Sequence, residues 1–193
     1  MVVAAHQARS RCAHQEVTLA IWSAANGERF RVGSAVMEPA DQALLDELLG
    51  HEDELQFTTF TNDTAWAIGT ALVESARRLD AAVTVDIRRG DWVIFHHAMD
   101  GTTPDNTAWV ERKIRAVQRF RHSSYYLGKF YWLHYGGFEA KTGLSLQEYA
   151  AHGGCFPILI RNAGMIGTIT VSGLPQAQDH ALVVDVLRAH LHS

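Results

Sequence analysis

The sequence has few cysteines, and its two thiols lie far apart. Neither Cys12 nor Cys155 belongs to a Cys-x-x-Cys pair, which excludes a disulfide framework and the usual structural zinc sites. Long apolar runs are absent as well. No run approaches the roughly 20 residues that a membrane-spanning helix needs, so we expect no membrane partner.

An excess of positive charge is also lacking. The chain has 17 Lys and Arg against 21 Asp and Glu, a net charge of −4, whereas a nucleic-acid-binding domain is normally basic. We therefore expect no nucleic-acid partner. Phosphate-binding glycine loops, His-Glu-x-x-His motifs, catalytic triads and paired carboxylates do not stand out either. The sequence predicts no catalytic residue and leaves open whether the protein is an enzyme.

The composition that is present is that of an ordinary globular protein. With 193 residues, 47% of them hydrophobic and 20% charged, the chain is long enough for one domain with a substantial core. Residues 1–40 differ from the rest. They carry Arg9 and Arg11 but not the apolar core of a secretory signal. We expect a cytoplasmic protein whose first 40 residues are disordered or outside the fold, followed by a domain over residues 41–193.

Apolar periodicity divides the domain into helices and hairpins. A spacing of three or four residues predicts helices, and alternation predicts strands. The helices are expected near residues 41–49, 61–79, 105–120, 123–134 and 176–191, and the hairpins near 83–97 and 157–171. Hairpins form antiparallel pairs. The sequence therefore predicts an α+β fold in which an antiparallel sheet is flanked by helices.

The first hairpin has a mixed polar face. A two-residue turn at Gly90-Asp91 would place Asp86 opposite Phe95. One face would then carry Val85, Ile87, Ile94 and His96, and the other Asp86, Arg88, Phe95 and His97. We expect ligand contacts on the second face, because it combines charge with aromatic surface.

Five segments together resemble a known family. They are Asp86-Ile-Arg-Arg, Gly101-Thr-Thr-Pro-Asp-Asn, Arg121-His-Ser-Ser-Tyr-Tyr, Glu148-Tyr-Ala-Ala-His-Gly-Gly-Cys-Phe-Pro-Ile and Ile166-Gly-Thr-Ile-Thr-Val-Ser-Gly-Leu-Pro-Gln. From about Asp41 to Leu191 the chain resembles the HbpS/GlcG-like family of haem-degrading domains, and most closely its uncharacterised branch. The resemblance implies a profilin-like α/β/α sandwich that assembles into homo-oligomers. It also implies haem as a candidate ligand, since some members of the family bind it.

Four histidines are candidate ligands of a haem iron, because imidazole is a common axial ligand. They are His96, His97, His122 and His152. Neighbouring residues of one strand point to opposite faces, so His96 and His97 cannot both reach one metal. The alternative for each is a histidine held by a hydrogen bond within the fold or at a subunit contact.

Other candidates would bind the rest of a ligand. Arg112, Arg115 and Arg119 form a basic stripe that suits carboxylates or phosphates, although a solvated face or an ion-pair strip between subunits is the more ordinary explanation. The full set of ligand-binding candidates is Asp86, Arg88, His97, Arg112, Arg115, Arg119, His122, Tyr125 and His152. The Gly153-Gly154 and Ser172 to Pro175 loops could bind an anion, but tight packing explains them better. Cys155 lies in an apolar context that favours a buried, inert thiol.

Two functions from different classes follow. The first is a homo-oligomeric protein that binds haem or another small, anionic, planar ligand near the polar face of the first hairpin and the basic helix. The second is a homo-oligomeric scaffold or interaction protein without small-molecule chemistry. Oxidative haem breakdown is a third hypothesis, for which no catalytic constellation is visible in the sequence.

Overall fold

The computed structural model describes residues 20–22, 29–31 and 37–192. The chain divides into two units, Met1–Met37 and Glu38–Ser193. In the first unit, strands β1 (Ala20–Trp22) and β2 (Arg29–Arg31) pair antiparallel. Most of the predicted extension, residues 1–40, lies outside the described residues, and its boundary and disorder stay predictions.

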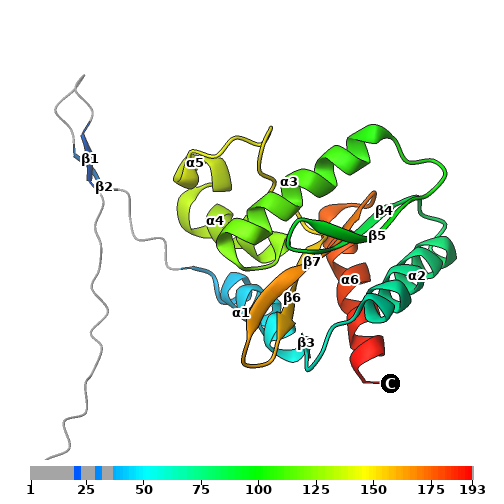
Figure 1. The fold of residues 1–193 in the computed structure, drawn as a ribbon. Coiled ribbons are helices and arrows are strands. Elements are labelled where there is room, and N and C mark those ends of the chain that lie inside the picture. The colour runs from blue at the N-terminus through cyan, green and yellow to red at the C-terminus, as the bar shows by residue number, and fades with distance from the viewer. Residues whose placement is uncertain (1–19, 23–28, 32–36, 193) are drawn as a thin grey trace, which may run out of the picture. The chain divides into compact units, whose positions relative to one another are not determined.

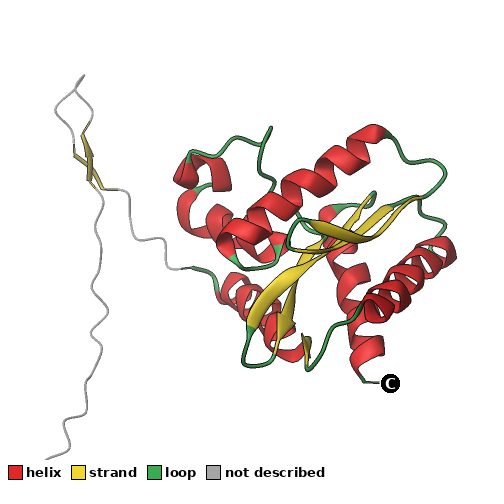
Figure 2. Cartoon of the chain, in the orientation of Figure 1, coloured by secondary structure: helices red, strands yellow, loops and turns green. Residues whose placement is uncertain are grey.

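The second unit contains one five-stranded sheet with helices on both faces (Figures 1 and 2). Its elements are α1 (Pro39–Glu54), β3 (Gln56–Phe57), α2 (Asn62–Arg78), β4 (Thr84–Arg89), β5 (Trp92–Ala98), α3 (Pro104–Phe120), α4 (Ser124–Tyr135), α5 (Phe138–Thr142), β6 (Cys155–Ile160), β7 (Gly164–Ser172) and α6 (Gln176–Leu191). The predicted α+β sandwich is confirmed, and the five expected helices and two hairpins are all present. The first helix is longer than predicted.

The order of strands across the sheet is β3-β6-β7-β4-β5. The four long strands pair antiparallel, as predicted, whereas the short β3 adds to β6 in parallel, with Gln56 beside Leu159. The sheet is therefore mixed. β3 and α5 were not predicted, because two and five residues are too few to display a period.

The predicted register of the first hairpin is wrong beyond its first two pairs. Arg88 pairs with Val93 as expected for the two-residue turn, but Ile87 then pairs with Phe95, because a bulge at Ile94 adds one residue to β5. A shift of one residue moves every later side chain to the opposite face. Asp86 is consequently opposite His96, and His97 is opposite Val85.

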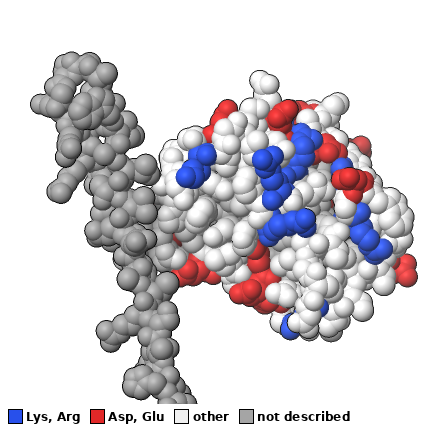
Figure 3. All heavy atoms as spheres, turned by 60° about the vertical axis from the view of Figure 1, so that its left-hand side comes forward, with Lys and Arg blue, Asp and Glu red and all other residues white. Residues whose placement is uncertain are grey.

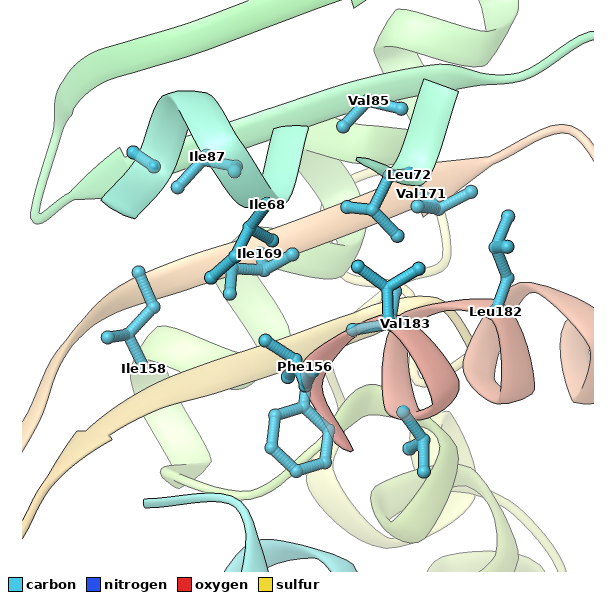
Figure 4. Close-up of a cluster of buried hydrophobic side chains, with 14 of the residues drawn as sticks. Ile68, Leu72, Val85, Ile87, Phe156, Ile158, Ile169, Val171, Leu182 and Val183 are labelled. Atoms are coloured by element: carbon cyan, nitrogen blue, oxygen red, sulfur yellow. The ribbon is translucent and has the colours of Figure 1, made fainter. Parts of the chain in front are cut away.

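The main core lies between the sheet and the helices α2 and α6. Figure 4 shows Ile68 and Leu72 of α2 packed over Val85 and Ile87 of β4. Val183 of α6 packs into the same layer, next to Phe156. The opposite face of the sheet is covered by α3, whose smaller apolar cluster contains Val110, Ile114, Val117 and Cys155. The face under α3 is therefore the one that carries polar side chains.

Helix starts agree with their capping residues. Thr61 accepts a hydrogen bond from the N–H of Thr64 at 3.1 Å, and the Thr64 hydroxyl accepts one from the N–H of Thr61. This reciprocal pair satisfies two N–H groups that the first turn of α2 leaves free. In the described part of the chain, no helix combines the length and apolar character required to cross a membrane.

Candidate functional site

The polar face of the first hairpin carries a closed charge cluster under α3. Asp86 is fully buried, and its carboxylate accepts hydrogen bonds from Arg88 Nε at 2.6 Å and His96 Nδ1 at 2.8 Å. Arg88 also pairs with Glu111 of α3. Burial lowers the pKa of Arg88, but hydrogen bonds to Asp86 and Glu111 outweigh it and keep the pKa above its ordinary value. Both oxygens of Asp86 are engaged, so this cluster holds β4, β5 and α3 together.

A second polar cluster, with an open cavity beside it, lies where α3 faces the first turn of α6. Lys113 Nζ donates to Asp179 Oδ2 at 2.8 Å and to the Val171 carbonyl at 3.0 Å, and both side chains are almost completely buried. Asp179 Oδ1 accepts from the N–H of Leu174 at 3.0 Å. Burial raises the pKa of Asp179, and the Lys113 ammonium opposes that rise.

Two glycines bring the 150–154 segment onto this cluster. A side chain on Gly153 would collide with the backbone of Gln176, and one on Gly154 would meet the Val171 carbonyl and Lys113 Nζ. Gly154 also has a φ of +116°, which favours glycine. Tight packing therefore accounts for both residues, and their position places His152 at the cavity.

The His152 ring lies close to the Trp109 ring and to the buried Lys113 ammonium. Its ring centroid is 5.2 Å from that of Trp109, and the guanidinium carbon of Arg112 lies 4.1 Å from the Trp109 ring centroid. Burial, together with Lys113 and Arg112, lowers the pKa of His152, so the imidazole is neutral near pH 7. Its buried Nδ1 has no hydrogen-bond partner among the described residues. A neutral imidazole can accept a hydrogen bond or bind a metal through a ring nitrogen that a ligand can reach.

Two cavities meet at His152 and Gln176. The smaller, of about 280 Å³, is also lined by Trp109, Lys113 and Asp179. The larger, of about 470 Å³, extends between α4 and α5 past Lys129, Trp132, Leu146 and Tyr149. Pockets for small molecules are typically mostly apolar, with a few placed polar groups. The larger cavity is somewhat more apolar than polar, and the smaller one is lined about equally by both kinds of surface. We define the pair, with His152 and Gln176 between its halves, as the candidate site.

The basic stripe contributes to this site mainly by fixing the segment around Tyr149, which lines the larger cavity. Arg115 Nε donates to the Glu148 carbonyl at 2.5 Å, and the Arg119 guanidinium lies 5.6 Å from the Tyr149 ring centroid. Arg112 is the member nearest the cavities, where it pairs with Asp105 at 3.4 Å. Figure 3 shows Lys and Arg mixed with Asp and Glu on the face it presents, rather than gathered into one basic area.

Of the remaining predicted residues, His122 and His97 lie elsewhere, whereas the Tyr125 ring lies beside Gly153, next to the site. His122 Nδ1 is 2.7 Å from Glu52, and this hydrogen bond raises the pKa of His122. The Tyr125 ring centroid is 5.1 Å from that of His180. His97 lines a groove between α2 and β5 on the other face of the sheet from Asp86, so its predicted place beside Asp86 is wrong.

Sequence reasoning placed His152 and Arg112 among the candidates but missed Lys113, Asp179 and Gln176. Lys113 follows Trp109 by four residues, and Asp179 follows the Ser172 to Pro175 loop. These positions could have indicated that both side chains belong to the same site. Among the residues that the structure describes, no group of three or more His, Cys, Asp or Glu side chains could hold a metal ion. The site therefore offers one imidazole to a cofactor rather than a complete metal centre.

Comparisons with known proteins agree with this architecture. A family model described as "Haem degrading protein HbpS-like" matches residues 60–188. A UPF0303 protein of Streptomyces avermitilis is 50% identical over 150 residues, covering 78% of this chain and 92% of the relative. A UPF0303 protein of Psychromonas ingrahamii is 43% identical over 143 residues, covering 74% and 90%.

Solved structures show the same fold. The crystal structure of Ybr137w protein matches with a TM-score of 0.70 and 31% identity, covering 77% of this chain and 87% of that one. HbpS matches with a TM-score of 0.54 and 21% identity, covering 70% and 92%. A complex described as PduOC:Heme matches with a TM-score of 0.57 and 18% identity, covering 68% and 94%. At such identities the last two establish a shared fold only.

Proposed function

The chain belongs to the HbpS-like family of haem degrading proteins, and from that premise we propose that it binds a small planar ligand, with haem as the candidate. The observation that carries the proposal is His152, a neutral imidazole that lines two adjoining cavities. The PduOC:Heme complex supports it by analogy, because that protein has the same fold.

The residues around His152 fit the chemistry of haem. Bound haem would supply an iron to which an imidazole can bind. His152 would hold that iron, while Trp109 and Trp132 would pack against the macrocycle. Arg112 lies over Trp109 at the smaller cavity, and Lys129 lines the larger one. These two cations would pair with the two carboxylates of haem.

The proposal is one of binding rather than of covalent chemistry. Cys155 is buried, as predicted, and burial raises the pKa of its thiol to about 12, so it remains protonated near pH 7. The Lys113 ammonium is occupied by Asp179. Neither group would therefore act as a nucleophile, and Lys113 would only shape the smaller cavity, which it lines.

We extend the proposal to the setting in which the domain works. The resemblance to the family favours a homo-oligomer, and we propose the cytoplasm as its location. The ligand site would lie wholly within residues 41–193, with residues 1–40 as an extension outside it.

Hemin titration of the full chain, followed by the Soret band, tests the ligand. We expect a saturable shift that His152→Ala weakens at least tenfold. The matched control is His97→Ala, which removes an imidazole on the opposite face of the sheet and should bind as the wild type does. Equal binding by His152→Ala, or an absence of saturation with the wild type, would overturn the haem proposal.

A scaffold without small-molecule chemistry is the second candidate function. The observation that favours it is a group of exposed large apolar residues at one side of the sheet, namely Trp66, Trp92 and Val93. Exposed apolar patches are one mark of a contact with another protein. A stable assembly that binds no hemin would support this candidate over the first.

A further inference from the structure

Strand β5 is an open edge of the sheet. It is the last strand in the order, and in the described part of the chain β4 is its only partner. The N–H of Met99 donates to the Val83 carbonyl at 3.2 Å. Because residues of an antiparallel strand alternate between the two sides, the backbone groups of His96 and Ala98 point toward the open edge.

This edge lacks the charged and proline residues that usually prevent pairing. β5 has the sequence Trp-Val-Ile-Phe-His-His-Ala and contains no Lys, Asp, Glu or Pro. Natural edge strands commonly carry such residues to block contact with another strand. Its bulge is at Ile94, so the stretch from Phe95 to Ala98 pairs regularly. That stretch is an available template for a further strand.

Exposed apolar side chains flank the same edge. Trp92 and Val93 are 59% and 43% exposed, and Trp66 of α2 is 65% exposed. The Trp66 ring packs edge-on against Phe95, with centroids 5.9 Å apart. Trp66 and Phe95 also line a groove of about 440 Å³ between α2 and β5. An interface that covers these residues would remove a large apolar area from water.

The groove also carries one acid and one base that have no partner. Glu74 and Arg77 line it from α2, both are exposed, and neither forms an ion pair with another described residue. In a two-fold symmetric contact the same patch meets itself. A patch with one charge of each sign can place Glu74 opposite Arg77 of the second copy and the reverse, whereas a patch of one sign would repel itself.

We propose that this face, formed by β5 and the groove along α2, binds a second copy of the chain, with the two β5 strands antiparallel. The sheet would continue from one copy into the other, and the two α2 helices would lie side by side across the symmetry axis. The inference rests on the homo-oligomeric part of the proposed function and is independent of the ligand.

Reversal of single charges tests this interface. Light scattering over a dilution series would measure self-association of the full chain and its variants. Glu74→Arg makes the patch basic and Arg77→Glu makes it acidic, so each should raise the dissociation constant at least about tenfold. A 1:1 mixture of the two variants should recover wild-type association, because their patches are then complementary. The double variant should recover it as well.

A matched reversal on the same helix provides the control. Arg78→Glu changes an exposed residue that does not line this groove, and it should associate as the wild type does. Circular dichroism confirms that each variant folds. A wild-type chain that stays monomeric would overturn the interface together with the homo-oligomer. An oligomer unaffected by either reversal would overturn the interface alone, and hemin titration of the same samples reports separately on the ligand.

Discussion

Lys113 and Asp179 form an ion pair of 2.8 Å that is almost completely buried, although 66 residues separate them in the sequence. The pair fastens α3 to the first turn of α6, and it forms one wall of the smaller cavity. An ion pair in this position depends on both partners, because either charge alone would be buried without compensation.

Lys113→Met should therefore be strongly destabilising. It leaves the Asp179 carboxylate buried without its cation, and we expect the free energy of unfolding to fall by about 3–5 kcal/mol. Lys113→Met combined with Asp179→Asn should lose less than the single variant, because the amide carries no charge and its oxygen can still accept from Leu174. Urea denaturation measures both. A double variant less stable than Lys113→Met would contradict the argument.

The pH dependence of stability should report His180. Burial lowers the pKa of His180 to about 3, so the folded protein keeps this imidazole neutral while the unfolded chain protonates it below about pH 6.5. Because the unfolded state then binds more protons, stability falls as the pH falls from 6.5 toward 3. Between pH 6.5 and 5 this residue should cost about 2 kcal/mol.

His180→Phe provides the comparison, since Tyr125 and Phe156 already surround this position with rings. Chemical denaturation at pH 7 and pH 5 should show a smaller loss of stability for the variant than for the wild type. Equal losses would show that His180 is not the group responsible.

His122 should behave in the opposite sense. The hydrogen bond to Glu52 raises the pKa of His122, so its contribution to stability is present below the unfolded pKa and is lost as the pH rises through the folded value. Glu52→Gln should lower the pKa of His122, as measured by NMR titration of the imidazole. Glu47→Gln, on the same helix, is the control and should leave that pKa in place.

Gly154→Ala should lower the free energy of unfolding by more than the strain of a positive φ alone would. At Gly154 a new methyl group would meet the Val171 carbonyl and Lys113 Nζ, whereas at Gly143, with a φ of +71°, it would meet nothing within 4 Å. We expect about 1–2 kcal/mol for Gly143→Ala from the backbone alone and a larger loss for Gly154→Ala. Thermal unfolding compares the two, and similar losses would refute a packing role for Gly154.

The sequence was sufficient for the long elements, because each repeats its own period over many residues. Helix α2 is an example, where Ile68 and Leu72 mark one buried face. The turn at Gly90-Asp91 was also predictable from local chemistry. The bulge at Ile94 was not, because β5 contains no glycine that would mark an extra residue.

The candidate site was predictable only in part, for a related reason. His152 attracted attention as a histidine beside two glycines, and Arg112 as a member of a basic stripe. Lys113 and Asp179 are significant because they form an ion pair, and only the tertiary structure brings them together. Arg115 and Arg119 were correctly seen to share a helix face with Arg112, but the partners that occupy them lie about 30 residues later.

The bulge at Ile94 decides which face of the sheet each later side chain of β5 occupies. It assigns the two adjacent imidazoles of this strand to different tasks, with His96 bound to the buried carboxylate of Asp86 and His97 turned to the groove along α2. If Ile94 paired with Ile87 instead of bulging out, Asp86 would face Phe95 and the two histidines would exchange faces, whereas deletion of Ile94 would keep Asp86 opposite His96. The bulge, and not the identity of either histidine, therefore decides which imidazole reaches the buried carboxylate.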